Sequence, residues 1–147
     1  MTIQKAIDLA DNLRPNGFTY TQKVEWLSKI DNQIYEEIFL RAKKNWKPET
    51  VEEEINGEVV TREVPGRIVP VFEFEGYDER TPEDTELLCD SLYDNLYVDY
   101  LVSKYCLYNR ENDAYNNYSM VFNAQYGQYE AWYRSKYEPI QRRVQRI

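Results

Sequence analysis

The chain has 147 residues, of which 30% are charged, with a formal net charge of −8 and no histidine. This length fits one domain with its own hydrophobic core, and the acidic balance argues against a protein that grips nucleic acid through an overall positive surface. The lack of histidine excludes Ser-His-Asp and Cys-His catalysis, and the two cysteines, Cys89 and Cys106, have neither zinc-site spacing nor the number needed for a disulfide framework.

Two helices are predicted in the first third of the chain. Apolar residues recur at helical spacing until the helix breakers of Arg14-Pro15-Asn16-Gly17. Thr19 and Gln22 form a capping box, and one apolar face then continues to just before Pro48. We therefore expect helices over about residues 3–13 and 20–46.

The period changes to two after Glu49, which predicts β-strands. TVEEEI and EVVTREV flank Asn56-Gly57, a dipeptide that favours the positive φ angles of a type I′ turn. Pro65-Gly66 predicts a second turn, after which RIVPVFEFEG reads as a third, shorter extended segment that Pro70 restricts to an edge or an irregular path. A polar loop is expected over EGYDERTPEDTE, residues 75–86.

Two tyrosine-rich helices are predicted after this loop. Asp90 or Ser91 can cap the first of these helices. In it, large residues recur at intervals of three and four positions as far as Tyr108. The next four residues, Asn109-Arg110-Glu111-Asn112, make a connection short enough to place the two helices antiparallel. The second helix extends to about Tyr137 and carries six tyrosines.

Together these elements predict a mainly α fold, an antiparallel bundle of about four helices with an inserted β-hairpin at about residues 49–76. We expect a single domain, in which residues 1–48 and 88–138 form the bundle, residues 49–87 the insertion and residues 139–147 an extended C-terminal arm. No apolar run approaches the roughly 18 residues of a membrane span, and the N-terminus lacks the apolar core of a signal peptide. A soluble, cytosolic protein with free thiols is therefore expected.

The tyrosines raise the question of what so many phenols do. Their helical spacing favours packing, within the bundle and in part between subunits. A tyrosine nucleophile would need arginines and histidines around a phosphate, and base stacking would need a cationic groove. The candidate subunit-interface residues are Tyr93, Tyr97, Tyr100, Tyr115, Tyr118, Tyr126, Tyr129, Trp132 and Tyr133.

Negative charge is concentrated in residues 49–99, which hold three Lys or Arg and sixteen Asp or Glu. No calcium-loop spacing occurs and no carboxylate pair stands out for glycoside hydrolysis, so neither a metal nor another cofactor is expected. A solvated hairpin face is the simplest interpretation. The alternative is a negative surface that faces DNA without adhering to it, and its candidate residues are Glu52, Glu53, Glu54, Glu73 and Glu75.

The C-terminal arm follows Pro139 and combines arginines with branched apolar residues. It is either a frayed terminus or a peptide that becomes ordered on a partner. The candidate docking residues are Ile140, Arg142, Arg143, Val144, Arg146 and Ile147.

Three segments resemble a known family: KAIDLADNLRPNGFTYTQKVEWLSKID, DTELLCDSLYDNLYVDYL and YNNYSMVFNAQYGQYEAWY. They are similar to small proteins encoded in the head-morphogenesis region of tailed phages and prophages of Gram-positive bacteria. These proteins are head-tail connectors, also called adaptor or head completion proteins. The resemblance covers most of the chain and is weakest in the hairpin and the tail.

The resemblance implies a structural virion protein that is not an enzyme and that forms a ring, commonly of twelve subunits, beneath the portal protein. Tail or neck proteins would bind its other side, duplex DNA would pass through its channel without sequence-specific binding, and the C-terminal arm would extend onto the portal. Such a protein assembles in the cytoplasm of the host bacterium, resides in the virion neck and contacts no membrane. The alternatives are another virion assembly protein, for tail completion or on the capsid, and a host-encoded helical interaction module.

Overall fold

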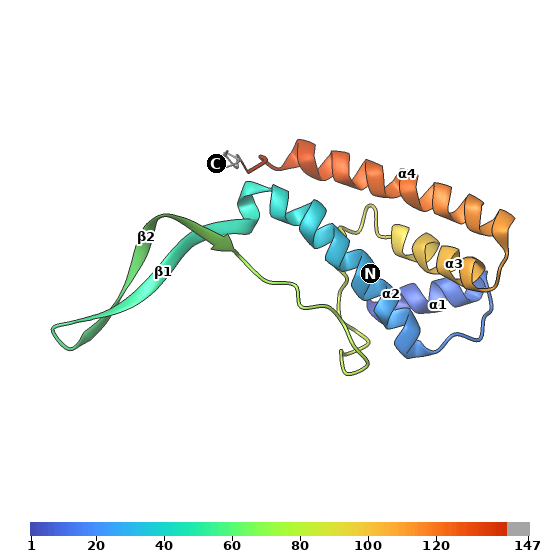
Figure 1. Cartoon of the computed structure of the whole chain (residues 1–147), viewed down its shortest axis with the longest axis horizontal. Helices are drawn as coiled ribbons and strands as arrows, with labels where there is room; N and C mark the ends of the chain where they lie inside the picture. The colour runs from blue at the N-terminus through green and yellow to red at the C-terminus, as the bar shows by residue number, and fades with distance from the viewer. Residues whose placement is uncertain (141–147) are drawn as a thin grey trace.

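A computed structural model describes residues 1–140 of the chain. Figure 1 shows the helices gathered into one body, from which a β-hairpin projects. In chain order the elements are α1 (Ile3–Leu13), α2 (Tyr20–Glu37), two 3-10 turns (Phe39–Arg41 and Lys43–Asn45), β1 (Trp46–Ile55), β2 (Glu58–Pro70), α3 (Leu96–Tyr108) and α4 (Asn112–Lys136).

The predicted mainly α class is wrong. Helices make up only 52% of the structure, and an antiparallel two-stranded sheet accompanies them. Residues 71–95 form a further long segment without a regular helix or strand. The chain is therefore a mixed α/β protein, because the hairpin and this segment together take up much of the middle of the sequence.

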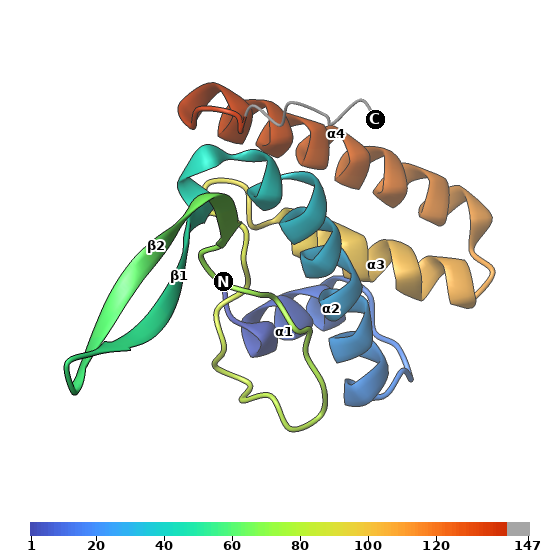
Figure 2. The same ribbon diagram turned by 60° about the vertical axis from the view of Figure 1, so that its left-hand side comes forward.

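The core is built around α3, whose buried side chains face all sides of the helix. This helix packs against α1, α2 and α4, and Figure 2 shows α4 lying along one side of it. Of α4, only Phe122, Tyr129 and Tyr133 are buried. One side of α4 therefore covers the core while the other faces away from it.

Local signals set the starts of the first helices as predicted. Thr2 caps α1 by accepting a hydrogen bond from the Lys5 amide, and Thr19 and Gln22 form the expected reciprocal capping box at α2. The predicted end of α2 at about residue 46 is wrong, because the helix stops at Glu37 and two 3-10 turns follow. There the side chains of Asn45 and Trp46 donate hydrogen bonds to the Phe39 and Leu40 carbonyls at 2.8 Å, and so satisfy groups that a longer helix would use.

The hairpin turn at Asn56-Gly57 is confirmed, with φ angles of 55° and 81°. The expected third extended segment is wrong, because β2 continues through Pro65-Gly66 to Pro70. The irregularity is absorbed inside the sheet, where pairing jumps from Thr50–Glu63 to Pro48–Ile68. Pro65-Gly66 therefore forms a bulge in β2 and does not end it.

Residues 71–95 are held against the helices by specific contacts. The Ile3 amide donates to the Thr85 carbonyl at 3.0 Å, and the Tyr77 amide donates to the Ser28 hydroxyl at 2.9 Å. Gly76 has a φ of 87°, and a Cβ there would lie 2.8 Å from the Ser28 oxygen. Only glycine allows both this backbone conformation and this close approach.

Candidate functional site

Many of the tyrosine hydroxyls form hydrogen bonds inside the subunit. Several donate to carboxylates far away in the chain: Tyr105 to Asp11 at 2.9 Å, Tyr126 to Glu37 at 2.6 Å and Tyr129 to Asp90 at 2.9 Å, and both Tyr77 and Tyr97 to Asp31. Their rings fill the core while their hydroxyls connect helices to one another and to residues 71–95.

Asp31 is the most enclosed of these carboxylates, with no exposed surface. It accepts hydrogen bonds from the hydroxyls of Tyr77 and Tyr97 and from the Leu88 amide. Burial raises the pKa of Asp31 to about 6, although these three donors act in the opposite direction. Asp31 thus connects α2, α3 and residues 71–95 at one buried point.

The same environment keeps the phenols protonated. Burial raises the pKa of Tyr97 and Tyr129 well above the usual value, with nearby negative charge adding to the effect, and burial raises that of Tyr100 to about 12. A nucleophilic tyrosine needs the opposite shift, toward the phenolate. These side chains are therefore suited to packing and hydrogen bonding, as their spacing suggested.

Three of the proposed interface tyrosines lie in the subunit core. Tyr97 and Tyr129 have no exposed surface and Tyr133 has 3%, so these three cannot meet another subunit while the core is intact. The other six are partly exposed and pack along the edges of the core: Tyr93, Tyr100, Tyr115, Tyr118, Tyr126 and Trp132.

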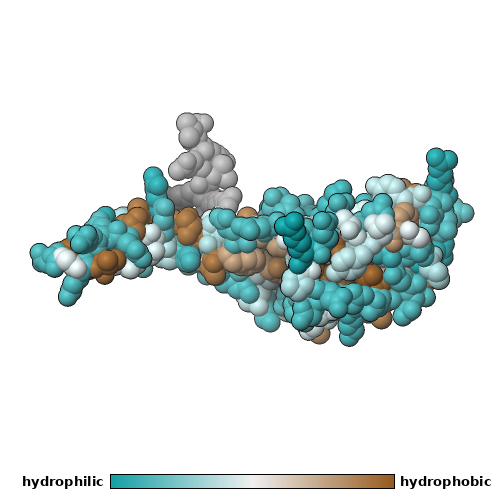
Figure 3. All heavy atoms as spheres, turned by 90° about the horizontal axis from the view of Figure 1, so that it is seen from below, coloured by the Kyte–Doolittle hydropathy of each residue, from teal (hydrophilic) through white to brown (hydrophobic). Residues whose placement is uncertain are grey.

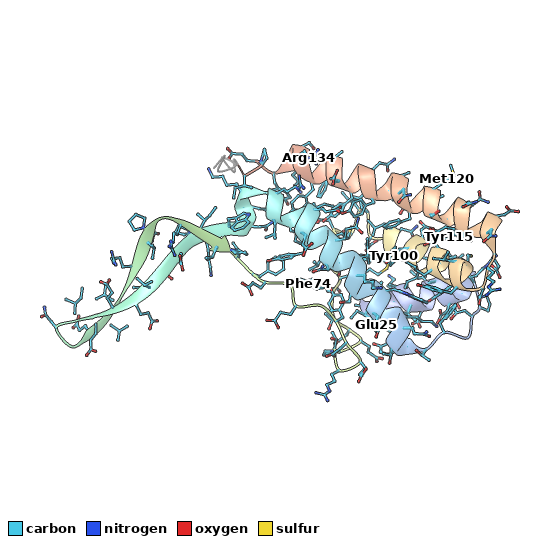
Figure 4. The ribbon with its side chains drawn as sticks, viewed as in Figure 1. Glu25, Phe74, Tyr100, Tyr115, Met120 and Arg134 are labelled. Carbon is cyan, nitrogen blue, oxygen red and sulfur yellow. The ribbon has the colours of Figure 1, made fainter. Side chains whose placement is uncertain are left out.

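The outward side of α4 forms a further candidate surface, which the spacing of the aromatic residues does not reveal. From Ala114 to Tyr129 the helix contains no charged residue, in a chain with 30% charged residues. Figure 4 labels Met120, which is 70% exposed on this helix. We call the uncharged outer face the exposed set Asn116, Asn117, Met120, Val121, Asn123, Ala124, Gly127 and Gln128. A solvated helix face normally carries charge, whereas the centres of protein interfaces are depleted of it.

The hairpin has two chemically different faces, which follow from its strand register. On one face, Glu52 lies opposite Thr61, Glu54 opposite Val59 and Glu63 opposite Thr50; we call this the acidic face. The other face holds the apolar residues Val51, Ile55 and Val60, the exposed Glu58 opposite Ile55, and an Arg62–Glu53 ion pair at 2.6 Å. Figure 3 shows the hairpin as a slender, largely hydrophilic projection with isolated apolar residues.

The five proposed channel glutamates do not form one surface. Glu52 and Glu54 lie on the acidic face, whereas Glu53 lies on the opposite face beside Arg62. Glu73 and Glu75 follow the hairpin and are exposed on residues 71–95. Successive side chains of a strand point to opposite faces of the sheet, so glutamates that are adjacent in sequence lie on different faces. The number of charges alone does not reveal this.

Cations and aromatic rings gather where the chain leaves α4. The Lys44 ammonium lies 3.6 Å from the centre of the Tyr137 ring, and the Lys136 ammonium lies 4.7 Å from that of Trp132. We call these four residues the basic aromatic patch. Arg134, labelled in Figure 4, is also exposed near this end of α4.

The start of the C-terminal arm is attached to the body. The amide of Ile140 donates to the Arg41 carbonyl at 2.8 Å, next to an isolated bridge between Ala42 and Pro139. The remaining docking candidates lie outside the described residues: Arg142, Arg143, Val144, Arg146 and Ile147.

An open groove of about 580 Å³ lies between the end of α2 and the end of α4. Its charged lining is mixed, with Glu36 and Glu130 beside Arg41 and Arg134, and its Glu37 already accepts the Tyr126 hydroxyl. Within residues 1–140, no group of three or more His, Cys, Asp or Glu is placed to hold a metal ion.

Comparisons with known proteins assign no family. No protein-family model matches the sequence, and neither the curated proteins nor the solved structures include a significant match. Over the described part of the chain, no helix combines the length and hydrophobicity needed to cross a membrane. Function must therefore be inferred from the surfaces described above.

Proposed function

We propose that this chain is a structural virion protein, a phage head-tail connector whose copies form a ring between the portal and the tail or neck proteins. It acts by binding other proteins and is not an enzyme. Duplex DNA passes through the channel of the ring without sequence-specific contacts. The number of subunits, commonly twelve, is what the resemblance of the three sequence segments implies.

The observation that carries this proposal is the exposed hairpin. A two-stranded hairpin is at best marginally stable alone, and this one projects from the body with Val51, Ile55 and Val60 exposed on one face. In an isolated subunit, this extension leaves its apolar side chains exposed to water. It is well suited to reach a neighbouring copy in an assembly.

The uncharged outer face of α4 supplies a second, different surface. A connector subunit binds copies of itself and also the portal, tail or neck proteins, so it needs more than one interaction surface. The hairpin and the outer face of α4 differ in shape and in charge, and can therefore serve different partners. An excess of acidic residues in 49–99 also suits a channel that must not hold the DNA backbone.

Mixing heads and tails from different lysates tests this function. A phage that lacks the gene should produce DNA-filled heads and normal free tails that do not join. Heads from this lysate should join tails from a normal lysate only after purified chain is added, whereas its tails should join normal heads without addition.

The alternatives predict other outcomes. A tail-completion protein would place the defect in the tail fraction, and a host-encoded interaction module would leave particle assembly intact. Either result would reject the connector assignment.

A further inference from the structure

The acidic face of the hairpin carries three carboxylates without a cation beside them. Glu52, Glu54 and Glu63 lie opposite threonine or valine, and none of them forms an ion pair within residues 1–140. On the other face, by contrast, Glu53 is paired with Arg62 at 2.6 Å. The acidic face is therefore negative, exposed and not neutralised by its own strands.

The basic aromatic patch has the complementary chemistry. Lys44 and Lys136 are exposed, and each lies over an aromatic ring. In the described part of the chain neither lysine forms an ion pair with a carboxylate. Both lysines lie near the Tyr137 ring, Lys44 at 3.6 Å and Lys136 at 5.5 Å, so they form one positive surface with an aromatic base.

We propose that the acidic face of one copy docks on the basic aromatic patch of a neighbouring copy. This inference rests on the proposed function, since it names the contact that joins subunits of the ring. Carboxylates would meet ammonium groups, and Val59 on the acidic face would meet the exposed edges of Trp132 and Tyr137.

The distance along the strand excludes the same contact within one copy. Lys44 lies two residues before β1 begins at Trp46, so the patch is at the base of its own hairpin. At about 3.3 Å per residue, Glu52 is roughly 20 Å along the strand from Trp46, and Glu54 is farther. The paired strands hold Glu52 and Glu54 away from this base, so these two carboxylates can meet the patch only between copies.

Such a contact is heterologous, because a hairpin meets a patch and not another hairpin. Heterologous contacts close into a ring when the rotation between copies permits and otherwise continue as a filament. The proposal also assigns Glu52 and Glu54 to the subunit contact and not to the DNA channel.

Charge reversal on both surfaces tests the contact. Glu52→Lys/Glu54→Lys alters the hairpin, Lys44→Glu/Lys136→Glu alters the patch, and a fourfold variant combines them. Each purified protein is added to heads from the phage that lacks the gene, and the bound copies per head are counted by quantitative mass spectrometry. Glu79→Lys/Asp84→Lys makes the same charge change in exposed residues outside both surfaces and serves as the control.

Each double variant should lose binding by roughly tenfold or more, while the control binds as the wild type does. The fourfold variant should recover binding. An equal mixture of the two double variants should also recover it, because lysine hairpins then meet glutamate patches and the reverse.

Circular dichroism establishes that the variants are folded, and recovery in the mixture shows that a loss comes from charge and not from misfolding. Loss without recovery, or no loss at all, would overturn the proposed contact while leaving the connector function intact. Failure of the wild-type chain to bind heads would instead reject the connector function. In that case, the self-association of the wild type and the variants, measured by sedimentation at low salt, still tests the contact. Self-association should be lost in each double variant and recovered in their mixture.

Discussion

Tyr97 donates a hydrogen bond to the Asp31 carboxylate across a separation of 66 residues, and both side chains are completely buried. The same hydroxyl accepts a hydrogen bond from the Cys89 amide at 2.7 Å. One phenol therefore connects α2 and α3 to residues 71–95. The buried tyrosines therefore have a structural role: the large ring fills the core, and its hydroxyl forms a hydrogen bond with a buried polar group.

Replacing Tyr97 by phenylalanine should destabilise the fold while keeping its shape. The change leaves a buried carboxylate and a buried amide each without one partner, which costs about 1–3 kcal/mol in free energy of unfolding. The matched control is Tyr118→Phe at a partly exposed position, expected to change stability by less than about 0.5 kcal/mol. Urea denaturation measures both, and equal losses in the two variants would refute the role given to the Tyr97 hydroxyl.

Asp31 should make stability depend on pH in an unusual direction. Its pKa of about 6 in the fold exceeds the ordinary value of 3.8, so between these values the folded state binds a proton that the unfolded state releases. The stabilisation is therefore complete below about pH 3.8 and is lost as pH rises through about 6. Over this window the loss is on the order of 3 kcal/mol.

Comparison with Asp31→Asn isolates this effect from that of other carboxylates. Asp11 would act in the opposite direction: burial tends to raise its pKa, but hydrogen bonds from Asn16, Lys23 and Tyr105 lower it overall. Unfolding free energies of both proteins should be measured from pH 4 to pH 7. The advantage of the wild type over the variant should shrink as pH rises, and an advantage that grows would contradict the assignment.

Gly76→Ala should weaken the attachment of residues 71–95 to α2. The added Cβ would meet the Ser28 oxygen at 2.8 Å with the backbone at a φ of 87°, which costs about 2 kcal/mol in stability. Gly17→Ala is the control, because nothing lies within 4 Å of its Cβ. Thermal unfolding should show a lower midpoint for Gly76→Ala alone, and a similar shift in both variants would contradict the packing argument.

Charge on the outer face of α4 should impair assembly without unfolding the subunit. Ala124→Arg places a cation within the uncharged outer face, where it is exposed and should change stability by less than about 0.5 kcal/mol. Binding to heads that lack the chain should nevertheless fall. Asn12→Arg adds the same charge on α1 and should bind normally; normal binding by Ala124→Arg too would remove this face from the assembly surface.

The sequence predicted several elements whose signals are local, although the expected cap of α3 at Asp90 or Ser91 is wrong, because that helix begins at Leu96 after Asn95. The capping box of Thr19 and Gln22, the Asn56-Gly57 turn and the breakers after α1 each determine a few neighbouring dihedral angles. The end of α2 was not predictable in this way, because Ile38 and Ala42 continue the apolar period, while side chains of Asn45 and Trp46 donate hydrogen bonds to carbonyls of the 3-10 turn that follows the helix.

The hydrogen-bond partners of the buried tyrosines were also not predicted, although the sequence contains one indication of them. Asp31 occupies a position in the apolar series of α2, between Leu27 and Ile34, where a charged residue needs buried donors. Which donors these are depends on the path of residues 71–95. That path is set by contacts to α1 and α2 and not by a local pattern.

Electron cryo-microscopy of the virion neck of the phage that encodes this chain tests the central claim most directly. The account predicts a closed ring of identical copies between portal and tail, in which each hairpin lies on the Lys44 and Lys136 surface of the next copy. A neck map of sufficient detail that contains no such ring, with the chain elsewhere in the particle or missing from it, would contradict the account.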